Sequence, residues 1–435
     1  MRTHSHNHEN GDKNYLFLNS LINLFRIISL LALLSVVTHV SALTLAEAEA
    51  IALGNDPLME SHKAVARAWD NDAVADNQLP DPQLRFGMYN MPLDSFDKSQ
   101  EPTTQLRLGV QQSFPKGDSL ELKQMQSEWH AKAERARAND RQRQLKRDVR
   151  EDFLNLYYQI QAGRIIQSSR KLFSQLVDIT EAHYASGRVN QQDVLRADLE
   201  LSRLDDREIK IQTDEEVLRA SLSQWLGDAA WQFVEFKFPA LPKLSSVDDI
   251  NQLITKHPSI AIKTAKLEAS KQDVTIANQQ YKPGWGLGLE YRKRFGENTD
   301  GSERADMMAA MLTLDIPLFT GKRQDKRVAA SEEKMMAVRL KRDDQLRKLK
   351  RIYDSNRVKL SKLEERKNKY QTGLIKSAES NSKAALKAYQ SGVTEFTNLM
   401  RAHMTELDVR LSDLRVRVDY ALAITQLLYV TGDEK

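Results

Sequence analysis

Two short stretches of this 435-residue chain match each other at a constant offset. They cover residues 183–197 and 388–402, in which Tyr, Ser, Gly, Arg and Ala recur 205 positions apart. The two glycines, Gly187 and Gly392, each separate two long stretches of helix-forming residues. Glycine adopts the positive φ that ends a helix and lets the chain reverse. The chain is therefore predicted to be one unit written twice, each unit with a helical hairpin and a tight tip.

Other landmarks recur in the same order. Asp56-Pro57 matches His257-Pro258, and Pro82 matches Pro283, both at an offset of 201. In each unit a helical stretch precedes two segments that alternate apolar and polar residues, the pattern of a strand with one apolar face. The first unit is predicted to span residues 43–226, with a β-hairpin at 83–114 and a tip at 184–190. Residues 227–248 are predicted to form a connector. The second unit is predicted to span residues 249–435, with a β-hairpin at 284–317 and a tip at 389–395.

Segment lengths constrain the packing of each unit. Residues 118–186 contain no proline and one glycine, which allows a helix of roughly 100 Å. A long helix with a one-sided apolar stripe needs cover along its whole length. The shorter helices expected at 43–79 and 191–225 together have that length. We therefore expect them to stack end to end beside the long helix, with the strands at one end and the glycine tip at the other.

The second long helix is expected over residues 322–391, and Gly373 alone breaks its composition. Its apolar residues follow the three-four spacing of a coiled-coil seam. Two polar residues in this seam, Asn356 and Lys367, are predicted to set its register. The seam comprises Leu346, Leu349, Tyr353, Asn356, Leu360, Leu363, Lys367, Tyr370 and Leu374.

Residues 1–42 have the pattern of a secretory signal peptide. Arg26 precedes an apolar run at 27–37, and small residues at 40–42 form a cleavage site. The run is too short to span a bilayer, so we expect an exported mature chain that begins near Leu43. Histidines 4, 6 and 8 have a metal-binding spacing, but we expect them to be removed with the signal peptide.

The composition argues against several classes of function. The 64 Lys and Arg nearly balance the 60 Asp and Glu, as on solvated helix faces, whereas nucleic-acid binding needs a one-sided charge. The absence of cysteine excludes disulfides and thiolate metal sites. No nucleophile–base pair, phosphate loop or metal-ligand spacing is present, so we expect no enzyme, no cofactor and no metal site. Five scattered histidines are interpreted as ordinary polar residues: His62, His130, His183, His257 and His403.

Methionines near the predicted strands have two interpretations. They could form a soft-metal path for Cu(I), or they could pack as apolar side chains, which we favour. The residues concerned are Met88, Met91, Met307, Met308 and Met311.

One chain supplies four amphipathic strands, which are too few to close a membrane barrel. Known single-chain barrels have at least about 8 strands, and open sheet edges are not tolerated in lipid. Copies arranged in a ring would share one closed sheet. Three copies would give about twelve strands around a water-filled lumen, and the helices would continue the wall as a second barrel.

These features together resemble the TolC family of outer-membrane efflux channels over Leu43 to Gly432. The resemblance implies a homotrimer with a twelve-stranded β-barrel in the outer membrane and a long α-barrel in the periplasm. It also implies a passive gated duct that receives substrate from an inner-membrane pump of the RND type through a periplasmic adaptor, a membrane fusion protein. The residues that carry the resemblance are 43–48, 55–57, 79–82, 112–115 with Gly117, 316–318 with Gly321, and the two Tyr-x-x-Gly tips.

Within the family, residues 91–96 and 114–117 look closest to the heavy-metal branch, which makes heavy-metal cations a predicted substrate. Alternatives are an outer-membrane duct for type I protein secretion or drug efflux, and a periplasmic coiled-coil adaptor, against which the duplication argues. Many members of the heavy-metal branch carry an acylated cysteine at the mature N-terminus. This chain has no cysteine, so that lipid anchor is not expected.

The resemblance also assigns roles at the two tips. The turns that receive the adaptor are, by position, Gly187, Arg188 and Val189 together with Gly392, Val393 and Thr394. The closed tip resembles a gate of a tyrosine, an aspartate and charged partners. The family's namesake has two aspartate rings where this chain has Asn398 and Arg401, so a cation-binding ring is not expected. Instead, arginines are predicted to pair with acidic residues and latch the tip, the residues concerned being Asp193, Arg196, Tyr389, Glu395, Asn398 and Arg401.

Overall fold

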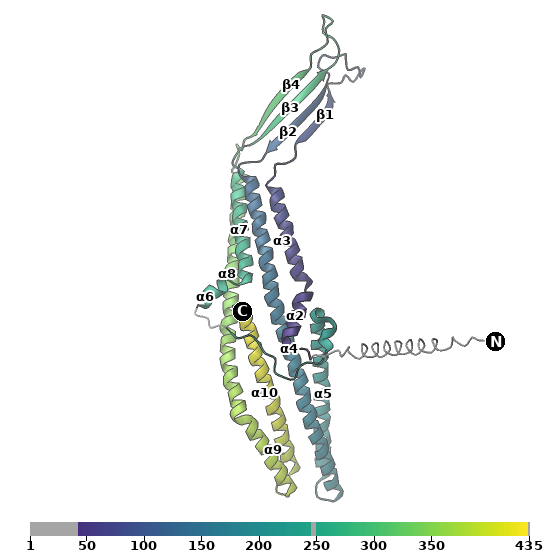
Figure 1. The fold of residues 1–435 in the computed structure, drawn as a ribbon, viewed down its shortest axis with the longest axis vertical. Coiled ribbons are helices and arrows are strands. Elements are labelled where there is room, and N and C mark those ends of the chain that lie inside the picture. The colour runs from purple at the N-terminus through teal and green to yellow at the C-terminus, as the bar shows by residue number, and fades with distance from the viewer. Residues whose placement is uncertain (1–41, 245–248, 434–435) are drawn as a thin grey trace, which may run out of the picture.

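The computed structural model describes residues 42–244 and 249–433. Over these residues the molecule is long and narrow (Figure 1), with a four-stranded sheet at one end and two helical hairpin tips at the other. The prediction of a mainly α fold with a small antiparallel sheet is confirmed. Apart from Ala42, the predicted signal peptide lies outside the described residues.

Capping residues define where the first helices begin. Thr44 Oγ1 accepts from the backbone N–H of Glu47, and the Glu47 carboxylate accepts from the N–H of Thr44, which is the predicted capping box. Asp56 caps the next helix by accepting from the N–H of Met59 at 2.8 Å, and Pro57 takes the first helical position. The elements of the first half are α2 (Leu45–Asn55), α3 (Pro57–Asp76), β1 (Gln83–Tyr89), β2 (Gln105–Phe114), α4 (Ser119–Ala185), α5 (Gln191–Leu226) and the short η1 (Gly227–Trp231).

The second half repeats this order with His257 in the capping position of Asp56. A short helix, α6, precedes it, and the long helix is divided by a π-helical turn, η2. The elements are α6 (Ile250–Thr255), α7 (Pro258–Gln279), β3 (Gly284–Arg294), β4 (Met307–Asp315), α8 (Gln324–Lys369), η2 (Tyr370–Leu374), α9 (Ile375–Gln390) and α10 (Phe396–Thr431).

The shorter helices cover the long ones in pairs. In Figure 1, α3 lies along the half of α4 nearer the sheet, and α5 lies along the half nearer the tips. In the second half, α7 and α10 cover α8 in the same manner. The two halves meet where α4 packs against both α7 and α10. No described helix combines the length and apolarity needed to cross a membrane.

The coiled-coil seam of the second long helix follows the prediction up to the π turn. Leu349 and Asn356 are buried, and Tyr353, Leu363 and Lys367 are half-buried. The final predicted seam residue, Leu374, is instead 46% exposed. The prediction fails there because a π turn inserts one residue into the helix and rotates all later residues about the helix axis. Beyond the turn, Ala378, Ser382 and Tyr389 take over the buried face.

Candidate functional site

The antiparallel register divides the sheet, whose strand order is β1-β2-β3-β4, into an apolar and a polar face. Directly paired residues share a face, as Phe86 does with Leu108 and Leu108 with Tyr291. The apolar face is largely uncovered, and a contiguous patch of this kind marks a contact with lipid or protein. Its exposed residues are Leu84, Phe86, Met88, Leu108, Val110, Trp285, Leu287, Leu289, Tyr291, Met308, Leu312 and Leu314.

Arginines and glycines dominate the polar face. Arg107 and Arg292 lie opposite each other on β2 and β3, and Arg85 lies one row away on β1. Glu290, between them, accepts from Arg292 Nε at 2.5 Å and lies 3.8 Å from Arg107 Nη1. Three glycines, Gly284, Gly286 and Gly288, leave this face of β3 almost bare of side chains.

The register separates the methionines. Met307 and Met311 lie on the polar face, whereas Met88 and Met308 lie on the apolar face and Met91 lies in the loop after β1. They therefore do not form one soft-metal path, which favours the packing interpretation. Among the described residues, no group of three or more His, Cys, Asp or Glu side chains is placed to hold a metal ion.

Both tip turns have the same geometry. Gly187 has φ +69° and Gly392 has φ +72°. In the first tip, Arg188 N–H donates to the His183 carbonyl and Gly187 N–H to that of Tyr184. The second tip repeats this pair of bonds at Val393 and Gly392. This is the Schellman motif that ends a helix on glycine, and both motifs lie at the same end of the molecule (Figure 1).

The predicted docking residues surround these turns. Gly187 and Arg188 are exposed in the first tip, and Gly392 and Val393 in the second. Val189 and Thr394, the remaining predicted docking residues, are partly buried where each turn leads into its next helix. A docking role for these turns stays a prediction.

The tyrosine of the predicted gate is buried. Tyr389 packs against Phe396, and its hydroxyl lies 3.3 Å from Nδ1 of His183 in the other tip. Burial raises the pKa of the Tyr389 hydroxyl, and the charge of Asp193 raises this pKa further. Sequence reasoning missed the contact with His183, because no spacing pattern links residues of two separate hairpins.

Two of the predicted gate residues, Arg196 and Asn398, form hydrogen bonds within one chain. Arg196 Nη1 donates to the Thr397 hydroxyl, which joins α5 to α10. Glu395 precedes the first residue of α10, and Asn398 donates to Thr394 at 3.2 Å. Within the described part of a single chain, no ion pair links Arg196 or Arg401 to an acidic residue. A pairing between neighbouring copies stays a prediction.

A polar cluster lies at mid-height, where α4 meets the ends of α7 and α10. The buried Arg150 donates to Glu49 at 2.7 Å and to Asp433 at 2.8 Å, which ties α2 and the end of α10 to α4. His257, interpreted from sequence as an ordinary polar residue, is 1% exposed. That interpretation was wrong because the histidine caps α7 and points inward. Its Nε2 lies 3.0 Å from the Tyr429 carbonyl, and its Nδ1 accepts from Ser259 N–H at 3.1 Å.

Burial in this cluster shifts two ionisable groups. It lowers the pKa of His257 to about 4, with a further contribution from the charge of Arg143. Burial also raises the pKa of Asp140, whose Oδ1 lies 3.9 Å from His257 Nδ1. The cluster therefore holds a neutral histidine at neutral pH.

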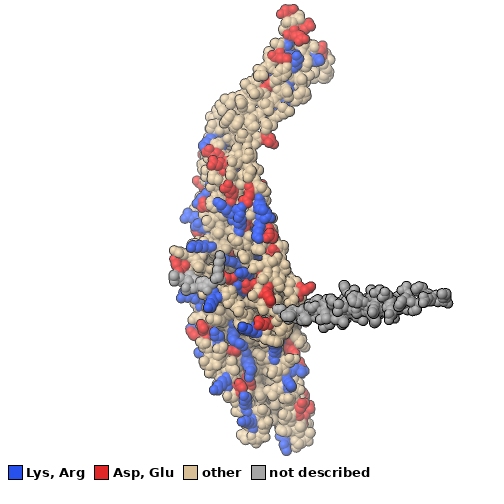
Figure 2. Space-filling view, in the orientation of Figure 1, with Lys and Arg blue, Asp and Glu red and all other residues tan. Residues whose placement is uncertain are grey.

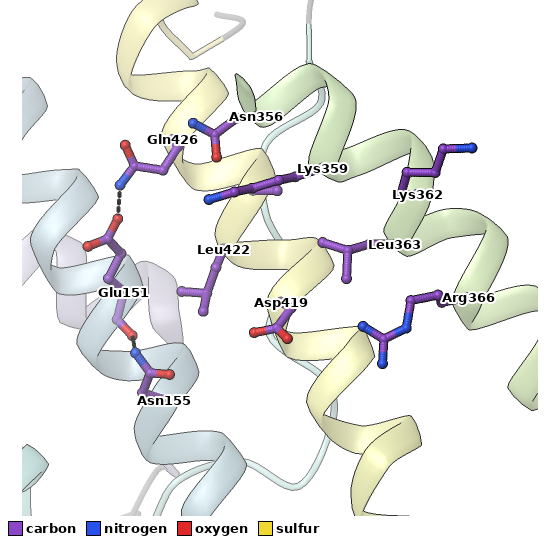
Figure 3. Close-up of a pocket in the computed structure, with 11 residues that line it drawn as sticks. Glu151, Asn155, Asn356, Lys359, Lys362, Leu363, Arg366, Asp419, Leu422 and Gln426 are labelled. Carbon is purple, nitrogen blue, oxygen red and sulfur yellow. Dashed lines mark hydrogen bonds between the residues drawn. The ribbon is translucent and has the colours of Figure 1, made fainter. Parts of the chain in front are cut away.

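A cavity of about 550 Å³ lies between α4, α8 and α10 (Figure 3). Glu151 on α4 hydrogen-bonds Gln426 on α10 across one side, and burial raises the pKa of this carboxyl. Lys359, Lys362 and Arg366 lie on the opposite wall, on α8. Because charges of both signs line it and no nucleophile–base pair is present among them, the cavity has the character of a solvated gap between helices.

Known proteins share this architecture. Residues 250–433 match the family described as outer membrane efflux protein. The outer-membrane channel OprN is 18% identical, with a TM-score of 0.76 over 90% of each chain. The fold is that of the TolC-family channels. The fold that the sequence resemblance implied is thereby confirmed.

Other solved structures agree with this channel fold. VceC, an outer membrane protein of Vibrio cholerae, is 16% identical with a TM-score of 0.74, covering 89% of this chain and 96% of its own. CusC is 14% identical with a TM-score of 0.72, covering 90% of this chain and 92% of its own. No curated protein matches the chain. Each of these structures is less than 25% identical to the chain, and the likeness is one of fold.

Proposed function

We propose that this protein is the outer-membrane exit channel of a tripartite efflux system. In this proposal it is a passive gated duct that carries substrate from an inner-membrane pump of the RND type, through a periplasmic adaptor, to the exterior. Three copies form the duct, with the sheet in the outer membrane and the helices extending into the periplasm. The tips around Gly187 and Gly392 face the adaptor. The proposed transport is passive, so it involves neither catalysis by this chain nor a cofactor.

The main support for this proposal is that the sheet has an unpaired strand edge on each side. β1 and β4 are the outer strands of the sheet and have one unpaired edge each. An unpaired edge cannot remain in lipid. In Figure 1, β1 lies on the side of α3 and α5, and β4 lies on the side of α8. A neighbouring copy that pairs β1 with β4 would complete the sheet and, after three copies, close it.

Exposed apolar residues continue both edges along the helices. On α5, Leu195, Leu199, Ile209 and Val217 are all more than half exposed and recur at helical spacing along one stripe. On α8, Met336, Leu340 and Val358 form a comparable stripe. Two different surfaces that bury each other make a head-to-tail contact, which forms a ring when the rotation between copies closes.

Assembly and conductance test the proposal. The purified chain should migrate as a heat-sensitive trimer on a mild-detergent gel and conduct ions in a planar bilayer. Leu199→Glu combined with Ile209→Glu should abolish the trimer, because it buries two carboxylates at the interface. Gln212→Glu, which adds a negative charge on the same helix about 110° around the axis from the centre of the stripe, should leave the trimer intact. A monomer that forms no channel would contradict the proposal.

The substrate is a finer question. Heavy-metal cargo stays a prediction from the sequence resemblance, and the likeness to CusC is a likeness of fold. Protein secretion and drug efflux are served by the same duct architecture and remain the alternatives. A periplasmic adaptor, the third alternative, would have to leave the apolar face of the sheet in water, which disfavours it.

A further inference from the structure

The polar face of the sheet carries an uncompensated positive charge. The charged side chains in its two central rows are Arg85, Arg107, Arg292 and Glu290. Glu290 is shared between two of these arginines, at 2.5 Å from Arg292 and 3.8 Å from Arg107. Arg85 is exposed, and no ion pair joins it to another residue of the described ranges. One carboxylate therefore faces three guanidinium groups.

Neighbouring rows do not supply the missing negative charge. Toward the helices, one row contains Gln83, Gln111, Gly288 and Met311. Asp315, further along the same face, is paired with Lys116 at 2.9 Å. Toward the loops, Arg294 shares the polar face with Gln105 and adds one more positive charge. The excess charge is thus confined to one belt across the sheet.

Geometry keeps these arginines in place. Arg107 lies over the ring of Tyr89 at 4.1 Å, a cation–π contact that fixes its guanidinium near the sheet. A Cβ on Gly109 would meet Glu290 Cγ at 3.4 Å, so a larger residue there would press on the shared carboxylate. Arg85 is exposed on this face, so a solute can approach it, whereas the glycines of β3 are buried beneath neighbouring side chains such as that of Met311.

We propose that Arg85, Arg107 and Arg292, here named the arginine belt, make the duct selective for anions, so that its substrates are anionic or neutral solutes. This inference rests on the proposed function, because only a closed sheet turns its polar face into a lumen. Three copies then place a ring of positive charge around a confined aqueous path. Low-dielectric walls focus such a field and raise the local concentration of ions of opposite sign.

Acidic loops at the outer end of the sheet act in the opposite direction. They cap the molecule in Figure 2, where red side chains gather beyond the strands. These loops are open to bulk solvent, and salt screens exposed charges within about 8 Å at physiological ionic strength. The belt lies inside the wall, where solvent has access from one side alone, so its charge should dominate selectivity. The acidic loop residues are Asp94, Asp97, Glu101, Glu297, Asp300, Glu303 and Asp306.

Reversal potentials in a planar bilayer under a KCl gradient test the belt. The wild-type channel should favour chloride over potassium, more strongly at low ionic strength. Arg85→Gln combined with Arg292→Gln should reduce the chloride-to-potassium permeability ratio several-fold, while Arg107 still balances Glu290. Lys293→Gln is the matched control, because Lys293 is the next residue on β3 and belongs to the opposite face.

The outcomes separate this inference from the proposed function. A trimer that conducts but favours potassium, or whose selectivity is the same in the double variant, would overturn the arginine belt and leave the channel standing. A correctly folded trimer with no conductance would overturn the channel itself. A loss of anion preference in the double variant but not in Lys293→Gln would support both.

Discussion

At the scale of single residues, His257 shows how one position can serve folding and couple it to pH. It occupies the capping position that Asp56 has in the first half. Its Nδ1 accepts from the Ser259 N–H, so the neutral ring must carry its proton on Nε2, which donates to the Tyr429 carbonyl. A second proton would have to replace the bond to Ser259. The buried ring therefore resists protonation.

Because His257 resists protonation in the folded chain, we predict that the folding stability depends on pH. The pKa of His257 is about 4 in the folded state, below the ordinary 6.5, so the unfolded chain binds the extra proton first. Its contribution to stability is present above pH 6.5 and is lost as the pH falls toward 4. At pH 5 the loss is about 2 kcal/mol. Thermal unfolding in detergent at pH 8 and pH 5 measures it.

His257→Asn supplies the comparison, because asparagine also caps helices but does not titrate. The variant should show a smaller fall in unfolding temperature between pH 8 and pH 5. Asp140, whose raised pKa acts in the opposite direction, is present in both proteins. An equal fall in both proteins would show that His257 does not carry the effect.

At the scale of elements, one inserted residue explains why the second long helix is divided. The span from Gly321 to Gly392 is one residue longer than the span from Gly117 to Gly187. A straight α-helix would rotate the tip by about 100° on account of one extra residue. The π turn over Tyr370–Leu374 absorbs that residue, and the face that leads to Tyr389 stays inward.

Deletions test this explanation. Removing Gly373 should convert the π turn to α-helix and preserve trimer yield and unfolding temperature, since the two spans become equal. Removing Arg347 instead should rotate the buried seam around Leu349 and Asn356 out of its groove and lower both quantities. A severe loss on removal of Gly373 would contradict the account.

The same elements show what can be predicted from the sequence. The glycine tips, the caps and the four alternating strands arise from local patterns that each act within a few residues. The end of the seam at Leu374 was missed, because a π turn has no residue signature of its own. Its one signal in the sequence is that the span from Gly321 to Gly392 exceeds the span from Gly117 to Gly187 by one residue. The contact between His183 and Tyr389 and the belt of arginines depend on register between segments about 200 residues apart.

At the scale of the whole molecule, the tips decide whether the proposed duct is open. Arg196 and Arg401 occupy corresponding positions of the two hairpins. If they latch neighbouring copies through Asp193 or Glu395, replacing both arginines by glutamate turns attraction into repulsion. Conductance in planar bilayers should then rise. Arg203→Glu, further along α5 and paired with Glu200 in its own helix, should leave conductance unchanged, and equal conductance in all three proteins would contradict the latch.

The unpaired edges of β1 and β4 also affect how the chain behaves before it assembles. Unpaired strand edges beside an apolar surface attract any other extended segment, including those of wrong partners. If three copies assemble as proposed, a single copy is prone to aggregate until it meets two others. Its abundance should be limited by how quickly copies meet and by how well periplasmic holding chaperones shield them. Overproduction of the chain should therefore yield aggregates in the cell envelope instead of additional channels.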